Sequence, residues 1–220
     1  MKTIFIHHHL GLGDHLICNG LVRHFAENNK VNLFCKNQNM YNISVMFADN
    51  KNISLIGVNN DQDIALYDLS KGNYLKIGIA LNSNFDYNKA NYFWDSVFYE
   101  QSNLEFDLSW SLFKYNKPST QQKLPDKPYA FICNKGSDGI NGIDYSSVDN
   151  NLEKVYSDNG YFFDNIDLII NATEIHTINS AYIHLIDRMN NINTDKLFYH
   201  KNFVKKPYSN FTRNKRWVVI

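Results

Sequence analysis

The sequence predicts an α/β protein with mostly parallel sheets, organised as two small domains, and three observations support this class. Short apolar runs of strand length alternate with segments of helical periodicity along the 220 residues. Three of the four prolines fall within residues 114–128 and interrupt this alternation, as prolines in a linker do. The alternation then begins again at Tyr129. We therefore expect domains at residues 1–118 and 119–220.

Strands are expected where short apolar runs are bounded by polar or turn residues. In the first domain these runs are residues 2–8, 31–35, 53–58, 64–67 and 75–80, and in the second they are 129–133, 174–178 and 196–200. Helices are expected where apolar residues recur at helical spacing. These segments are residues 14–27, 40–47, 148–157, 164–172 and 179–190.

The composition predicts a reduced, cytoplasmic globular protein. The three cysteines have no paired spacing and lie in apolar surroundings, as reduced core residues do. The chain does not open with a charged segment and a long apolar core, and no apolar run reaches the length of a membrane span. The formal net charge is zero, which argues against a general nucleic-acid binder.

Residues 196–220 carry seven basic side chains and no acidic one. This basic tail is a candidate for peripheral contact with the inner face of a membrane. It ends in the apolar segment Trp217–Ile220, which we expect to dock on the protein, with the tail packing back toward the first domain.

The most informative motif follows the first predicted strand. Gly11-Leu12-Gly13-Asp14-His15 is a glycine-containing turn that opens the first predicted helix. Glycines let the backbone turn tightly and approach a ligand, and a helix start offers free N–H donors. The third glycine of a dinucleotide-binding turn is missing. The motif predicts a site for a phosphate-bearing ligand, and a plain strand–turn–helix start is the alternative.

A second motif spans Glu174–Arg188. A short apolar strand meets Asn179 and Ser180, both good helix N-caps, and leaves room for an anion at the helix start. His184 lies one turn further along, on the same face as Ser180. The alternative is a capped helix that carries a core histidine.

Histidines gather at the end of the first strand. In an extended segment His7 and His9 point the same way, so with His15 they form a conceivable zinc site. No carboxylate or cysteine at ligand spacing completes the set, and His8 and its neighbours are better interpreted as hydrogen-bonding groups that line a cleft. Asp61-Gln62-Asp63 matches the Asp-x-Asp metal motif, but we expect a solvated surface turn there.

Three blocks resemble glycosyltransferases of the GT-B fold, specifically the heptosyltransferase-like group (family 9) and its shorter capsule and phage-encoded relatives. Gly11–His15 resembles the Gly-Asp turn after the family's first strand. The aromatic residues between Trp94 and Phe113 resemble a block of the shorter relatives, and Glu174–Arg188 resembles the donor-site motif. The resemblance implies two Rossmann-like domains that face each other across a cleft, the first for the acceptor and the second for a nucleotide-sugar.

The resemblance also implies a role for each matching residue. Asp14 occupies the position of the general base that deprotonates an acceptor hydroxyl. The residues implied to hold the diphosphate of the donor are Lys135, Asn179, Ser180, Ala181 and His184. The residues then expected to line the acceptor side of the cleft are Gly11, Gly13, His9 and His15.

The implied activity is an inverting, metal-independent transfer of a hexosyl or heptosyl sugar in polysaccharide biosynthesis. The donor is a nucleotide-sugar, the acceptor is a glycan or lipid-linked sugar, and no cofactor is expected. Helix dipoles and a lysine take the place of a metal in stabilising the departing diphosphate. Asn179 and Ala181 stand where the family usually has Asp and Gly, and the second domain is short. The main alternative is a nucleotide- or glycan-binding module that has lost transfer, and a weaker one is an epimerase of the same fold.

Overall fold

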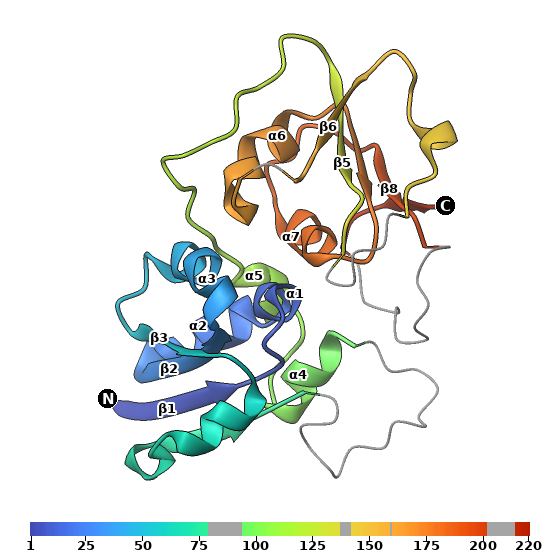
Figure 1. Cartoon of the computed structure of the whole chain (residues 1–220). Helices are drawn as coiled ribbons and strands as arrows, with labels where there is room; N and C mark the ends of the chain where they lie inside the picture. Colours follow the sequence, from blue (N-terminus) through green and yellow to red (C-terminus); the bar gives the residue numbers. More distant parts are fainter. Residues whose placement is uncertain (79–93, 137–141, 159, 202–213) are drawn as a thin grey trace. The chain divides into compact units, whose positions relative to one another are not determined.

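The computed structural model describes residues 1–78, 94–136, 142–158, 160–201 and 214–220. The chain divides into two compact units, with the division between Asn116 and Lys117. Each unit has its own sheet, and every strand pair in both sheets is parallel (Figure 1). The expected α/β class with parallel sheets is therefore confirmed.

The sheet of the first unit has the strand order β3-β2-β1-β4. Its strands are β1 (Lys2–His7), β2 (Asn29–Lys36), β3 (Ile53–Val58) and β4 (Asn73–Lys76). The first strand in sequence, β1, thus lies inside the sheet, between β2 and β4. Parallel strands that are covered on both faces bury runs of apolar residues, as Ile4–Ile6 of β1 and Leu33–Cys35 of β2 do.

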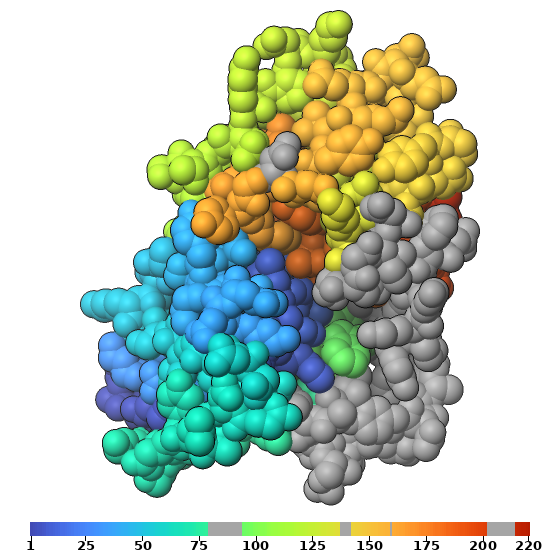
Figure 2. Space-filling view, in the orientation of Figure 1, coloured from blue at the N-terminus to red at the C-terminus, as the bar shows by residue number. Residues whose placement is uncertain are grey.

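Helices and short turns cover the two faces of this sheet (Figure 1). One face is covered by α2 (Asn19–Asn28) and α3 (Met40–Phe47), and the other by the 3₁₀ segments η2 (Asp61–Leu66) and η3 (Leu69–Lys71). Phe5 and Phe34 project toward η2 and pack with Ile64 in one apolar cluster. In the space-filling view the side chains of η2 and η3 (teal) largely hide the strands behind them (Figure 2).

The helix predicted at residues 14–27 is interrupted at Cys18. It forms α1 (Leu12–Ile17) and α2, because the hydroxyl of Tyr99 enters the helical hydrogen-bond ladder. That hydroxyl donates to the carbonyl of Ile17 (2.8 Å) and accepts from the N–H of Leu21 (3.2 Å), which would otherwise bond to each other. Tyr99 lies in α4 (Ser96–Gln101) and is fully buried, so α4 is tied to the start of the unit.

The sheet of the second unit has the order β6-β5-β7-β8-β9. Its strands are β5 (Tyr129–Cys133), β6 (Glu153–Tyr156), β7 (Glu174–Thr177), β8 (Leu197–Tyr199) and β9 (Trp217–Val219). Counted from β5, this order is 2-1-3-4-5, the arrangement of flavodoxin-like doubly wound sheets. The helices are α6 (Ile166–Asn171) and α7 (Ala181–Arg188), and Tyr182 of α7 packs edge-on against Phe131 of β5.

Two predicted elements of the regular pattern are wrong. Residues 64–67 belong to a 3₁₀ turn and its end, because the side chain of Asn60 accepts the N–H groups of Gln62 and Asp63 and starts a turn there. Residues 148–157 contain strand β6 where a helix was predicted, because Glu153–Tyr156 pairs with the free edge of β5. The strand predicted at 75–80 is found two residues earlier, as β4 (Asn73–Lys76). Residues 79 and 80 of the predicted range lie outside the described part of the chain.

The apolar end of the chain docks on the protein, as expected, but it joins the sheet of the second unit, whereas the tail was expected to pack toward the first. Trp217–Val219 pairs with β8. The buried carboxylate of Asp187 holds this strand in place, because it accepts from the indole N–H of Trp217 (3.0 Å) and from the backbone N–H groups of Asn214 and Lys215. Three of the seven basic residues of the tail lie in 202–213, outside the described residues.

Candidate functional site

Each unit has a topological switch point, where the connections from two neighbouring parallel strands leave toward opposite sides. Such points lie at the carboxyl ends of the strands and are the usual ligand sites of open α/β sheets. In the first unit the point falls between β1 and β4, and in the second it falls between β5 and β7. The predicted residues of both motifs follow these strands directly.

Asp14 lies in the first turn of α1, just beyond the carboxyl end of β1. Its Oδ1 accepts a hydrogen bond from the indole Nε1 of Trp94 (3.1 Å). Burial raises the pKa of the Asp14 carboxyl to about 6, although the charge of His9, the Trp94 bond and the backbone N–H groups of Asp14 and Gly11 act in the opposite direction. A carboxylate with this pKa is mostly ionised at neutral pH and is a stronger base than an ordinary aspartate.

The glycine at position 11 leaves room for the carboxylate of Asp14. A Cβ built on Gly11 would lie 2.6 Å from Oδ2 of Asp14, so a side chain there would displace the carboxylate. Gly11 is the residue before α1, in extended conformation, and Gly13 lies in the first turn. Both glycines therefore belong to the turn that carries Asp14.

Two fully buried histidines, His8 and His15, lie beside this turn. Their rings meet edge to face, with centroids 4.3 Å apart. His8 Nδ1 donates to the carbonyl of His9 (2.6 Å), so its Nε2 carries a lone pair. Within the described part of the chain, this Nε2 and both ring nitrogens of His15 have no hydrogen-bond partner. Burial lowers the pKa of His8 to about 3 and that of His15 well below its usual value, so both rings are neutral at neutral pH.

His9 lies on the Asp14 side of the same loop. Its ring packs on the indole of Trp94 (centroids 4.9 Å apart) and meets the edge of Phe98. Gly78, the second residue after β4, has a φ of +123°, and a Cβ there would lie 2.6 Å from the His9 ring. The carboxyl ends of β1 and β4 therefore meet at His9.

His7 projects to the other face of the sheet and does not join His9 and His15. Its Nε2 lies 2.8 Å from Oδ1 of Asp61, and its Nδ1 lies 2.8 Å from the hydroxyl of Tyr74. The conceivable zinc set of His7, His9 and His15 is therefore not assembled. Asp61 lies in an exposed turn, as expected, and its carboxylate also pairs with the buried His7. Within the described residues, no group of three or more His, Cys, Asp or Glu side chains is arranged to hold a metal ion.

In the second unit, the carboxyl ends of β5 and β7 bring Cys133 and Ser180 together. Their Sγ and Oγ atoms are 3.1 Å apart. Ser180 is the N-cap residue of α7 in extended conformation, and its side chain makes no capping bond. Asn179 beside it is exposed. The N–H groups at the start of α7 are thus not capped by Ser180 itself, which leaves donors for an external anion.

Lys135 and His184 complete the predicted donor residues. Lys135 follows β5, and its Nζ forms an exposed ion pair with Asp158 (2.5 Å). An exposed pair of this kind is weak, so a phosphate can compete for the lysine. His184 lies one turn into α7 and is buried, and its carbonyl accepts from Arg188. Ala181 is the first residue of α7. The predicted residues thus lie on the β5 and β7 sides of one switch point.

Sequence reasoning missed three residues at these points. Asn134 directly follows β5, and Thr177 is the last residue of β7. Each has a buried side-chain oxygen atom without a hydrogen-bond partner among the described residues. Trp94 was assigned only to an aromatic block, although it bonds Asp14. The position of Asn134 and Thr177 at strand ends was a usable signal, whereas the contact of Trp94 with a residue 80 positions away was not.

A buried hydrogen-bonded chain of Glu174, His176 and His200 was also missed. His200 Nδ1 accepts the N–H of Asp144 (3.0 Å), so His200 donates through Nε2 to Nδ1 of His176 (3.0 Å). His176 then donates to Glu174 (3.4 Å). Burial lowers the pKa of His176 below its usual value, and it lowers the pKa of His200 to about 4, so both rings are neutral at neutral pH. This chain holds the segment at Asp144 to the ends of β7 and β8.

Comparison with known proteins adds no relative. No protein-family model, curated protein or solved structure matches the chain. In the described part of the chain, every helix is too short or too polar to cross a membrane.

Proposed function

We propose that the protein is a metal-independent, inverting glycosyltransferase of the GT-B type. It would move a sugar from a nucleotide-sugar donor to a hydroxyl of a glycan or lipid-linked acceptor. The observation that carries this proposal is the position of the two motifs, each at the switch point of its own parallel sheet. In GT-B enzymes one domain holds the acceptor and the other the donor, and we assign residues 1–118 and 119–220 to these roles.

The donor part of the proposal rests on the start of α7. A diphosphate needs N–H donors, a positive dipole end and a nearby cation. The N–H groups of Ser180 and Ala181 supply the donors, and Lys135 supplies a cation that is held only by an exposed ion pair. The small side chains of Ser180 and Ala181 leave room for the phosphate oxygens. Cys133, Asn134 and Thr177 lie at the same switch point and would form the floor of the donor site.

The acceptor part of the proposal rests on Asp14. In the reaction, the acceptor O–H bond breaks and its proton moves to the carboxylate. The acceptor oxygen forms a bond to the anomeric carbon from the face opposite the diphosphate, which leaves with the electron pair of the broken C–O bond. The raised pKa of Asp14 suits a base that must stay ionised near neutral pH and still attract a proton.

A thermal-shift screen with nucleoside diphosphates and their sugars tests the donor part. A ligand at a hundred times its dissociation constant adds about 2.7 kcal/mol to the free energy of unfolding. We expect at least one nucleoside diphosphate to raise the melting temperature by several degrees without added metal, and inorganic phosphate to raise it less. No shift with any nucleoside diphosphate at millimolar concentration would contradict the proposal. A shift without turnover of any sugar would favour a binding module that has lost transfer.

A further inference from the structure

The two oxygen atoms of the Asp14 carboxylate lie in different surroundings. Oδ1 accepts the indole N–H of Trp94 (3.1 Å), whereas Oδ2 lies over Gly11, at the position where a side chain is missing. An N–H donor that bonds one oxygen fixes the plane of the carboxylate. The lone pairs of Oδ2 are then presented from a defined direction.

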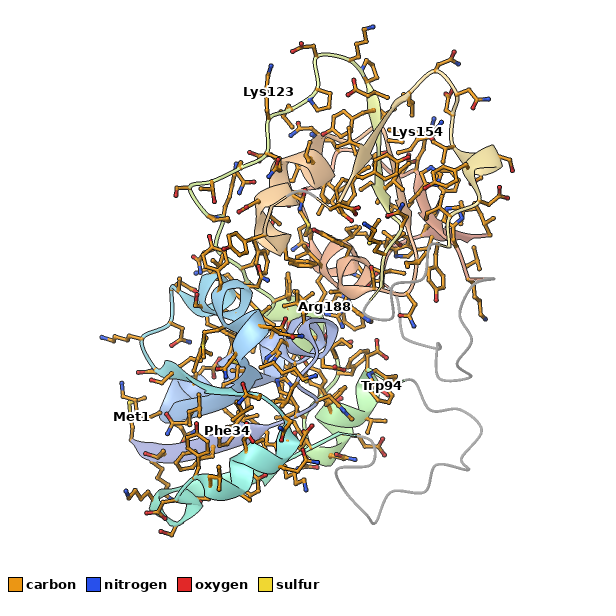
Figure 3. The ribbon with its side chains drawn as sticks, viewed as in Figure 1. Met1, Phe34, Trp94, Lys123, Lys154 and Arg188 are labelled. Carbon is orange, nitrogen blue, oxygen red and sulfur yellow. The ribbon has the colours of Figure 1, made fainter. Side chains whose placement is uncertain are left out.

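Trp94 is itself held in place by packing. Its ring contacts His9 (centroids 4.9 Å apart, 39° between the planes) and meets Phe98 edge to face (6.2 Å). His9 is in turn confined by Phe98 and by the close approach of Gly78. Trp94 lies two residues before α4, near the start of that helix, where Figure 3 labels it. The direction of the indole N–H is thus set by His9, which follows β1, and by Phe98 of α4.

We propose that Trp94 is a positioning residue, an inference that rests on the proposed function. Its indole orients the Asp14 carboxylate through Oδ1, so that Oδ2 takes the proton of the acceptor hydroxyl. The indole makes no bond to substrate in this role and transfers no proton. Its N–H stays on Oδ1 while the O–H bond of the acceptor breaks and the Oδ2–H bond forms.

The same bond affects the charge state of the base. A donor to Oδ1 favours the ionised carboxylate, so its removal raises the pKa of Asp14 above its present value of about 6. Trp94→Phe removes the N–H but keeps an aromatic ring against His9 and Phe98. The positioning role therefore predicts a measurable change at Asp14 that a ring with a merely structural role would not cause.

The experiment follows the indole N–H signals of the wild-type protein by two-dimensional NMR during a pH titration. The chain has three tryptophans, so the signals are readily assigned with single Trp→Phe variants. We expect the Trp94 signal to shift with a midpoint near 6, and the shift to disappear in Asp14→Asn. The Trp110 signal is the internal control, because Trp110 lies in a different helix, Leu108–Ser111, and packs against Phe106. A Trp94 signal that does not follow Asp14 would overturn the inference.

A second arm measures the Asp14 carboxyl directly by carbon NMR in Trp94→Phe, with Trp110→Phe as the matched variant. Loss of a hydrogen bond to a charged group predicts a rise of the Asp14 midpoint by about 1–2 pH units in Trp94→Phe, and no change in Trp110→Phe. An unchanged midpoint in folded Trp94→Phe would overturn the inference. Both arms measure the Trp94–Asp14 interaction without substrate. A negative result in them therefore contradicts the role of Trp94 alone, whereas the proposed function is tested by the turnover of the wild-type protein.

Discussion

Asp14→Asn is expected to lower turnover of the donor by about 10²–10⁴-fold, because asparagine keeps the shape of the side chain and its bond to Trp94 but cannot accept a proton as a base. Donor binding should stay within a few-fold of wild type. In the wild-type enzyme, kcat/KM should fall tenfold per pH unit below about 6, the pKa of Asp14, and the variant should lack this limb. Donor hydrolysis measured over pH 4.5–8 checks both results.

The stability of the same variant separates a base from a helix cap. The pKa of Asp14 in the folded protein lies above its ordinary value of 3.8. The free energy of unfolding therefore decreases as the pH rises from about 4 to 6, and it stays lowered at pH 7. Asn removes this decrease. Because the Asp14 side chain is partly exposed, we expect Asp14→Asn to stabilise the protein by about 1–2 kcal/mol at pH 7 and by only a small fraction of that at pH 4.

Asp107→Asn is the matched control for Asp14→Asn. Asp107 is an exposed aspartate directly before the helix Leu108–Ser111 of the first unit, and it makes no capping bond there. We expect normal turnover and normal stability at both pH values from urea denaturation. Normal turnover in Asp14→Asn itself would remove Asp14 from the mechanism, and His9, which packs on Trp94 beside Asp14, would become the candidate base.

Ser180→Glu is expected to lower the affinity for a nucleoside diphosphate by at least about 100-fold, which corresponds to about 2.7 kcal/mol. The introduced carboxylate would lie at the N-terminus of α7, where it fills the space of the diphosphate and repels its charge. A glutamate at a helix start interacts favourably with the helix dipole, so the fold should be retained. Isothermal titration with the nucleoside diphosphate found in the thermal-shift screen measures the effect.

Ser180→Gly is the control for this substitution. Glycine is also accepted at an N-cap position, and Ser180 makes no capping bond that it would lose. It loses only the contact with Cys133. We expect affinity within a few-fold of wild type. Equal affinity in Ser180→Glu and Ser180→Gly would place the nucleotide elsewhere.

Local patterns were sufficient to predict much of the fold. The strands at 53–58 and 129–133 and the helix at 40–47 follow from apolar periodicity, and the structure has them with those bounds. The interruption at Cys18 could not be predicted, because the Tyr99 hydroxyl that causes it comes from a residue 82 positions away. Strand β6 was missed for a similar reason, since pairing with β5 decides its conformation.

The candidate sites show the same division. The turn at Gly11–Asp14 and the helix start after Ser180 are visible in the sequence, because turn and cap residues act locally. The surroundings that set their chemistry are not local. The indole of Trp94 reaches Asp14, and Asp61 reaches His7 across 54 residues, only because parallel strands bring distant loops to one edge of the sheet.

The most direct test of the proposed activity is proton NMR of the purified protein with a panel of nucleoside diphosphate sugars, without metal and with water as the acceptor. The account predicts release of nucleoside diphosphate from at least one donor. The first sugar formed should have the anomeric configuration opposite to that of the donor, and release should be lost in Asp14→Asn and Ser180→Glu. Release with retained configuration, equal release in the two variants, or no release from any donor would contradict the account.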